Sequence, residues 1–326
     1  MHTLSKIIIV LSISFVLLLT FLYFFFVYYL LGNTYFDELV LKGMLKLNTN
    51  SNFSIGLAAY GICNNSNYLV NTTSIMSNFT IYNISVESTE FNSNYSSLQL
   101  NAPIKSSNDV LLLQNALELS NKSFEFVENV LSLQGNVNLS GEGLKYTSIS
   151  LSNCSGNVTN SSYINPEITY IYSGNIYKVS LPIKGFLGIK LLQNPLRIEF
   201  YGRVNNFTLN QTVITNLSTG FIISSPKFYV VGSKLNPLSL GMFYATPEIV
   251  FAGSGCGNTA IFHKLNAELS LEYLNNSYLP FSCYYTEGTN IAEKAYGIFP
   301  YKCINNSVIF SNTTNISKSF AYINCS

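Results

Sequence analysis

Two hydrophobic patterns follow one another along the chain. Residues 7–31 form a run of 25 residues without a charge, interrupted only by Ser12, Ser14 and Thr20. As an α-helix this run would measure about 37 Å, which is enough to cross a hydrocarbon core of roughly 30 Å. A secretory signal peptide has a shorter apolar region and a small-residue cleavage site, and this run has neither. The pattern therefore predicts a transmembrane anchor that contacts membrane lipid.

The charges beside the run predict its orientation. Lys6 precedes it, and Asp37 and Glu38 are the first charges that follow it. Because positive charge favours the inner side of a membrane, we expect residues 1–6 to form a cytoplasmic stub. The chain is then a single-pass protein of the cell membrane, with its N-terminus inside and its C-terminal domain outside.

After the run, the dominant pattern is alternation with a period of two. In Leu265–Tyr273 every odd position is apolar and every even position is polar. Such alternation is typical of a strand that buries one face. Val110–Leu119 fits a strand or a short helix equally well. Other strand candidates are residues 79–86, 131–139, 168–172, 177–181, 198–204, 207–213 and 227–231. The pattern predicts a mainly β ectodomain, an antiparallel fold of the β-sandwich type.

The length of the ectodomain and its breaks predict two lobes. A polar segment with three glycosylation triplets, residues 153–166, is the best boundary. We expect one β-rich lobe over residues 32–160 and a second over 161–326. The second lobe contains a cysteine-rich C-terminal part, residues 256–326.

Nineteen Asn-x-Ser/Thr triplets follow the apolar run, and their number predicts a glycosylated exterior domain. In eleven of them the middle residue is apolar, aromatic or Cys, as expected if a strand turns the Asn to solvent and the middle residue to the core. The candidate acceptors are Asn52, Asn64, Asn71, Asn78, Asn83, Asn94, Asn121, Asn138, Asn153, Asn157, Asn160, Asn206, Asn210, Asn216, Asn275, Asn305, Asn312, Asn315 and Asn324.

Six cysteines also follow the run, and an even count in an exported domain predicts three disulfide bonds. Four of them fall in the cysteine-rich part, which we expect to be stapled to itself; Cys63 with Cys154 is then the simplest remaining pair. A metal site is disfavoured, because the chain has no Cys-x-x-Cys and only one histidine beyond His2. The disulfide candidates are Cys63, Cys154, Cys256, Cys283, Cys303 and Cys325.

Composition narrows the classes of function. The chain has 17 Lys+Arg and 16 Asp+Glu, fewer charged residues in total than its 40 Asn, and a net charge of +1. No basic patch for nucleic acid is present. Neutral amides keep their hydrogen bonds where carboxylates protonate, so the mixture suits an acidic exterior. In this composition the chain resembles surface proteins of acidophilic archaea.

Catalytic signals are few. A Ser-His-Asp triad would need His263 with Asp37 or Asp109, and no Gly-x-Ser-x-Gly is present. The two aspartates lack the flanking residues of an aspartic protease dyad. Ser224–Lys227 matches Ser-x-x-Lys without its companion motifs. Glutamate pairs offer many combinations and no distinguishing signal, and we expect most glutamates to be solvated: Glu87, Glu90, Glu125, Glu128, Glu142, Glu167, Glu199 and Glu248. We therefore lean against an enzyme and expect no catalytic residues, no metal and no cofactor.

The leading hypothesis is a structural or interaction protein of the cell surface, whose partners are other surface proteins or copies of itself. No glycosylation triplet starts in residues 217–274, which indicates either core or a contact face free of sugar. An apolar N-terminal helix before a β domain superficially resembles archaeal pilins, which implies a filament subunit as the first alternative. The second alternative is an anchored extracellular hydrolase or ligand-binding module.

Overall fold

The computed structural model describes residues 54–59, 62–63, 66–67, 71–88, 94–105, 110–132, 140–141, 149–150, 167–192, 197–214, 228–229, 247–254, 258–281, 283–287, 293–312 and 323–324. The chain divides into two compact units, Met1–Ser51 and Asn52–Ser326, and all described residues belong to the second. Within the described part no helix is long and apolar enough to cross a membrane. The predicted anchor, residues 7–31, lies outside that part.

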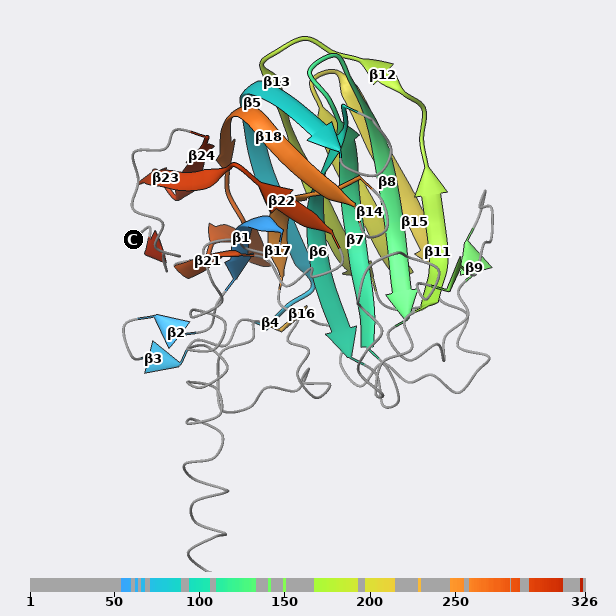
Figure 1. Cartoon of the computed structure of the whole chain (residues 1–326). Coiled ribbons are helices and arrows are strands. Elements are labelled where there is room, and N and C mark those ends of the chain that lie inside the picture. Colours follow the sequence, from blue (N-terminus) through green and yellow to red (C-terminus); the bar gives the residue numbers. More distant parts are fainter. Residues whose placement is uncertain are drawn as a thin grey trace, which may run out of the picture. The chain divides into compact units, whose positions relative to one another are not determined.

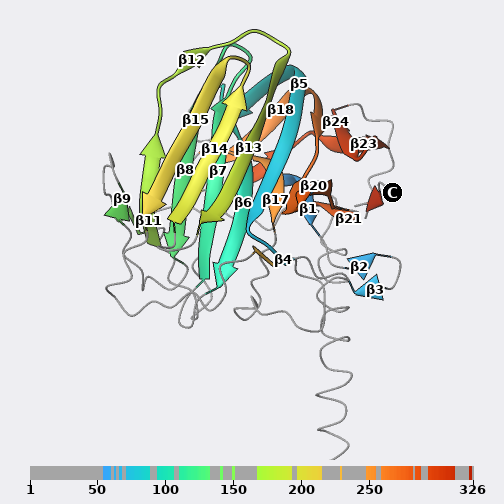
Figure 2. The ribbon, with the colours of Figure 1, turned by 180° about the vertical axis from the view of Figure 1, so that it is seen from behind.

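Strands dominate the described residues, and most belong to two large sheets whose pairings are antiparallel, save one parallel contact in the second (Figures 1 and 2). The prediction of a mainly β, sandwich-type fold is confirmed. The first sheet has the order β10 (Ile149–Ser150), β11 (Glu167–Ser173), β8 (Ser123–Ser132), β7 (Val110–Leu119), β6 (Ser96–Lys105), β17 (Glu248–Ala252), β1 (Ile55–Ala59), β21 (Cys283–Glu287) and β25 (Ile323–Asn324), and β12 (Tyr177–Lys178) also pairs with β8.

The second sheet is built around the 15-residue strand β5 (Ser74–Ser88). Its order is β23 (Phe299–Ile304), β24 (Ser307–Ser311), β18 (Thr259–Leu269), β5, β13 (Ile183–Leu192), β14 (Arg197–Val204), β15 (Phe207–Ile214) and β9 (Ser140–Gly141), with β19 (Glu272–Asn275), β20 (Ser277–Pro280) and β22 (Lys294–Tyr296) beside this path. The described residues also form two short two-stranded sheets: β2 (Ile62–Cys63) with β3 (Ser66–Asn67), and β4 (Asn71–Thr72) with β16 (Phe228–Tyr229).

The segment that fitted a helix or a strand equally, Val110–Leu119, is strand β7. It pairs along its whole length with β6 on one side and with β8 on the other. A central strand must bury apolar side chains toward the facing sheet, and Leu111, Leu113 and Leu117 do so with period two. Pairing with β6 and β8 therefore determines the strand conformation, which the local sequence alone does not distinguish from a helix.

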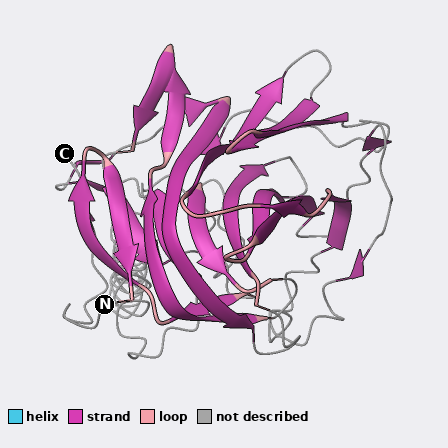
Figure 3. Ribbon diagram, turned by 90° about the horizontal axis from the view of Figure 1, so that it is seen from above, coloured by secondary structure: helices cyan, strands magenta, loops and turns pink. Residues whose placement is uncertain are grey.

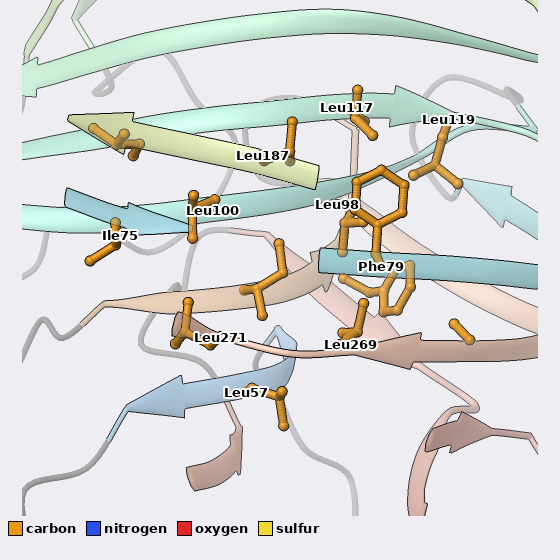
Figure 4. Packing of buried hydrophobic residues seen from close by; sticks show 14 of the residues in the cluster. Leu57, Ile75, Phe79, Leu98, Leu100, Leu117, Leu119, Leu187, Leu269 and Leu271 are labelled. Carbon is orange, nitrogen blue, oxygen red and sulfur yellow. The ribbon is translucent and has the colours of Figure 1, made fainter. Parts of the chain in front are cut away.

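The hydrophobic core lies between the two sheets. Leucines of β6 and β7, such as Leu98 and Leu117, meet Phe79 of β5 and Leu187 of β13 (Figure 4). All four side chains are buried. Seen from above, the strands form curved layers around this interior (Figure 3). Because apolar side chains fill the space between the sheets, every polar residue found there needs its own explanation.

Asparagines make two of the tight hairpins. Asn205 and Asn206 join β14 to β15, and Asn305 and Asn306 join β23 to β24. Asn305 and Asn306 both have positive φ, 47° and 65°, as a type I′ turn requires. Asn tolerates this backbone region better than other residues with a Cβ. The abundance of Asn therefore has a local structural use as well as the predicted glycosylation.

The acceptor asparagines of β5 lie where the alternation predicts them. Phe79 and Ile84, the middle residues of two triplets in β5, are buried, whereas Asn78 and Asn83 are exposed. Asn312 differs, because its side chain bonds the backbone of His263 and Leu265. Also exposed are Asn94, Asn121, Asn206, Asn210, Asn275 and Asn305. Occupancy of these sites by glycans stays a prediction.

Both sheets contain strands from each side of the expected lobe boundary at residue 160. The first sheet pairs β8 with β11, and the second pairs β5 with both β13 and β18. The two expected lobes, residues 32–160 and 161–326, thus share both sheets. Among the cysteines, Cys303 of β23 is disulfide-bonded; the pairing scheme stays a prediction.

Candidate functional site

One face of the first sheet is polar. On the four adjacent strands β17, β6, β7 and β8, the residues that alternate with the core leucines include amides and carboxylates. The register places Glu248 of β17, Asn101 of β6, Gln114 of β7 and Asn129 of β8 in one row across the sheet. Gln99 lies two residues before Asn101 on the same face of β6. These strands run side by side in Figure 1.

These side chains form a continuous set of hydrogen bonds. Nδ2 of Asn101 donates to Oε1 of Glu248 at 2.9 Å, and Nε2 of Gln114 donates to Oε1 of Gln99 at 2.9 Å. Nδ2 of Asn129 donates to Oε1 of Gln114 at 2.6 Å. A longer contact of 3.5 Å joins Nδ2 of Asn101 to Oε1 of Gln99. The row is therefore one hydrogen-bonded unit.

The second carboxylate comes from a distant part of the chain. Glu293 directly precedes β22, which pairs with β18 of the second sheet and also lies close to β17 and β1. Oε2 of Glu293 accepts a hydrogen bond from Nε2 of Gln99. We call the six residues Gln99, Asn101, Gln114, Asn129, Glu248 and Glu293 the carboxyl–amide network.

The network is largely shielded from solvent. Gln99 is 2% exposed, and Asn101 and Glu248 are each 1% exposed. Ser97 extends the set, because its hydroxyl accepts from Gln99 and donates to the carbonyl of Gly253. Electrostatic interactions strengthen in such an environment, so the amide donors act strongly on the carboxyl groups.

A different acidic residue, Glu128, lies on the opposite face of β8 and points into the core. It is 0% exposed and lies opposite Asn115 of β7. Asn115 donates to the carbonyls of Gly188 and Tyr201 on the second sheet, at 2.8 and 3.0 Å. Among the described residues, neither oxygen of Glu128 has a hydrogen-bond partner. Burial, with a smaller effect of the Glu125 charge, raises the pKa of Glu128 well above its usual value. Burial therefore favours the neutral form of this carboxyl group.

Glu118 lies on the polar face, opposite Ser97 and Glu125. Burial raises its pKa from 4.5 to about 7, a hydrogen bond with Ser254 opposes the change, and the Glu125 charge adds to it. Among the described residues its Oε2 has no hydrogen-bond partner. Glu118 and Glu128 are thus acids that the fold holds protonated at acidic pH.

The histidine, aspartate and Ser-x-x-Lys candidates from the sequence are not part of the carboxyl–amide network. His263 of β18 meets Glu87 of β5 at 3.1 Å, but both side chains are more than half exposed, at 55% and 59%. Asp37, Asp109 and residues 224–227 lie outside the described residues. The expectation that most glutamates are solvated is wrong for Glu128 and Glu248, because strand pairing carries both into the interior.

A second polar cluster, which is partly buried, lies on the second sheet. The hydroxyl groups of Ser74, Tyr201 and Tyr278 contact one another, with Ser74 Oγ 3.1 Å from the Tyr201 oxygen and 2.7 Å from the Tyr278 oxygen. The Tyr201 ring covers Gly188, where a Cβ would lie 2.1 Å from the ring. Burial, above all, raises the pKa of Tyr201. The raised pKa makes this phenol a poor base, and the packing of its ring over Gly188 joins β14 to β13.

Asparagine has two separate uses in this fold. Among the residues that the structure describes, the buried asparagines are Asn101, Asn115 and Asn258, and none of them begins a glycosylation triplet. Those described as exposed include the eight acceptors named above. Gln99, Gln114, Glu118 and Glu293 were not singled out by the sequence. The signal that could have found them is Ser97-Leu-Gln-Leu-Asn101, whose polar positions all fall on one face.

The fold and this site define a β-sandwich protein that buries carboxyl groups against neutral amides. Comparison with known families identifies the family: the model described as Thermopsin matches residues 28–298, well over half of the chain. The chain belongs to the thermopsin family. The matched region includes all six residues of the carboxyl–amide network. No curated protein matches the chain.

Family membership overturns the leading functional hypothesis. Thermopsins are archaeal acid proteases, which points to an extracellular hydrolase. The prediction of a structural or interaction protein is therefore wrong, and the hydrolase alternative agrees with the finding. The error has a physical cause: the sequence predicts solvated glutamates, whereas Glu128 and Glu248 are buried in the fold.

Replacing Glu118 by Gln should change how stability depends on pH. A folded pKa of about 7 against 4.5 means that Glu118 contributes stability below about pH 4.5 and loses it as the pH rises toward 7. Glu118→Gln should flatten this fall by about 3 kcal/mol between pH 4 and 7. Denaturant unfolding at a series of pH values measures it. Glu199→Gln is the matched control; equal slopes for wild type and Glu118→Gln would contradict the assignment.

Proposed function

We propose that this protein is a peptidase that cleaves peptide bonds at acidic pH, and that Glu293 and Gln99 form the centre of its active site. The observation that carries the proposal is the hydrogen bond from the buried amide of Gln99 to the carboxylate of Glu293. Family membership supports the class of reaction. The network supplies the acid–base groups that this reaction needs.

Glu293 is the general base and acid in this proposal. Its carboxylate takes a proton from water while the water oxygen bonds to the carbonyl carbon of the peptide, which yields a tetrahedral intermediate. The protonated Glu293 then gives its proton to the amide nitrogen, the C–N bond breaks, and a carboxylic acid and an amine leave. The carboxylate is regenerated, so one group serves both steps.

Gln99 supports the general base. A hydrogen bond donated to a carboxylate favours its ionised form, so the Gln99 amide helps Glu293 to act as a base in acid. Its other N–H donates to the Ser97 hydroxyl, which itself donates to the carbonyl of Gly253, so the Gln99 amide is held in place beside Glu293. The amide stays neutral and keeps its donors at any pH at which the protein works.

Glu248 and Asn101 form the supporting pair. Asn101 donates to Glu248 and also approaches Gln99, so the two carboxyl groups are linked through two amides. Carboxyl groups coupled in this way need not ionise together, which allows one to be charged while the other is neutral. This is the division of roles that acid proteolysis requires.

Replacement of Glu293 by Gln tests the assignment. Glu293→Gln keeps the shape and removes the base, so kcat/KM on a denatured protein substrate at pH 2–4 should fall by about 10²–10⁴-fold. The same loss is expected for Gln99→Leu. Glu87→Gln, which changes an exposed carboxylate, is the matched control and should retain full activity.

The outcome is interpretable only for folded variants, so each should show a wild-type circular dichroism spectrum. A folded Glu293→Gln protein with wild-type activity would refute the assignment of the base. Full activity of folded Gln99→Leu would show that the Gln99 amide takes no part in the reaction, and would refute its place in the proposed active site.

We further propose that the peptidase acts outside the cell, tethered by residues 7–31, with glycans on its exposed asparagines and three disulfide bonds. The uncharged run of 25 residues and the exposure of eight acceptor asparagines support this setting. The full chain should stay in the membrane pellet after an alkaline carbonate wash and leave it in detergent. Release by carbonate alone would contradict the tether.

A further inference from the structure

The network contains a row of amides with a common direction. Asn129 donates to Gln114, Gln114 donates to Gln99, and Gln99 donates to Glu293. In each amide the NH₂ end faces Glu293 and the carbonyl end faces away. The row crosses three adjacent strands, β8, β7 and β6, so the sheet itself spaces its members.

Neighbouring contacts fix this direction. Oε1 of Gln99 receives two amide donors, from Gln114 at 2.9 Å and from Asn101 at 3.5 Å. A reversed Gln99 would turn its NH₂ toward these donors and its oxygen toward the Glu293 carboxylate. A reversed Gln114 would likewise place oxygen against oxygen at Gln99. Each amide thus holds the next in a single orientation.

On the basis of the proposed function, we propose that Gln114 and Asn129 are positioning residues, which hold the Gln99 amide with its NH₂ toward Glu293. We call the three amides Asn129, Gln114 and Gln99 the amide relay. Hydrogen bonds in a chain polarise one another, so the relay also strengthens the bond that Gln99 donates. Neither residue needs to touch the substrate.

The relay suits acidic conditions because amides do not titrate. A carboxyl group in the place of Gln114 could do the same work only when protonated, since it needs an O–H to donate to Gln99. Once ionised it could only accept, and Gln99 would reverse. This difference allows a positioning role to be separated from simple packing.

Two exchanges at Gln114 form the test, with activity on a denatured protein substrate measured from pH 2 to 6. Gln114→Met fills the space without hydrogen bonds and should lower kcat by about 10–100-fold at every pH, with little change in KM. Gln114→Glu should be nearly wild type at the lowest pH and lose activity as the pH rises, at a lower pH than wild type does.

The control is Gln211→Glu, the same exchange at a half-buried position of β15 whose side chain bonds Tyr172, outside the relay. Its pH profile should match wild type. Asn129→Leu replaces Gln114→Met should the latter not fold, and a smaller loss of kcat in the same direction is expected.

Glu293→Gln measured alongside separates the two proposals. If it is active, the proposed active site is wrong. If it is inactive while both Gln114 variants show the wild-type rate and pH profile, the relay is refuted and the active site stands. A loss in Gln114→Glu that is the same at every pH would also refute the relay, because it would show a packing effect only.

Discussion

The hydrogen bonds between amides and carboxyl groups on the polar face of the first sheet are the constraint on which this structure depends. Leucine and phenylalanine exclude water from the interior of a β-sandwich without needing hydrogen bonds, but a buried carboxyl group needs hydrogen-bond partners. Asn101 and Gln99 supply them to Glu248 and Glu293. Because the donors are neutral, the arrangement adds no buried positive charge, and it persists where ion pairs would be lost to protonation.

The same preference for neutrality extends through the molecule. Burial favours the protonated forms of Glu118 and Glu128, so acid does not destabilise the fold at these positions, whereas their ionisation at higher pH does. The small number of charged residues and the large number of asparagines agree with this preference. Asparagine serves inside as a hydrogen-bonding partner, in hairpins as a turn residue, and outside as an acceptor for glycans in our proposal.

Much of the fold followed from the alternation of residue types. The segments 198–204 and 207–213 became β14 and β15, and Phe79 and Ile84 turned inward as their triplets required. The site could not be predicted from the same pattern, because alternation shows which residues share a face but not which residues cover that face. In the sequence Glu248 has no feature that separates it from a surface glutamate, and only strand pairing places it opposite Asn101. Glu293 reaches Gln99 across 194 positions of sequence, a contact that no local pattern encodes.

Labelling of the reactive carboxyl group tests the central claim most directly. The active protein would be inactivated at acidic pH by a small epoxide that esterifies carboxylates, and the adduct located by peptide mass spectrometry. The account predicts that activity is lost in step with an adduct on Glu293, and that a denatured-protein substrate slows both. Inactivation in step with an adduct on Asp37 or Asp109, with Glu293 unmodified, would contradict it.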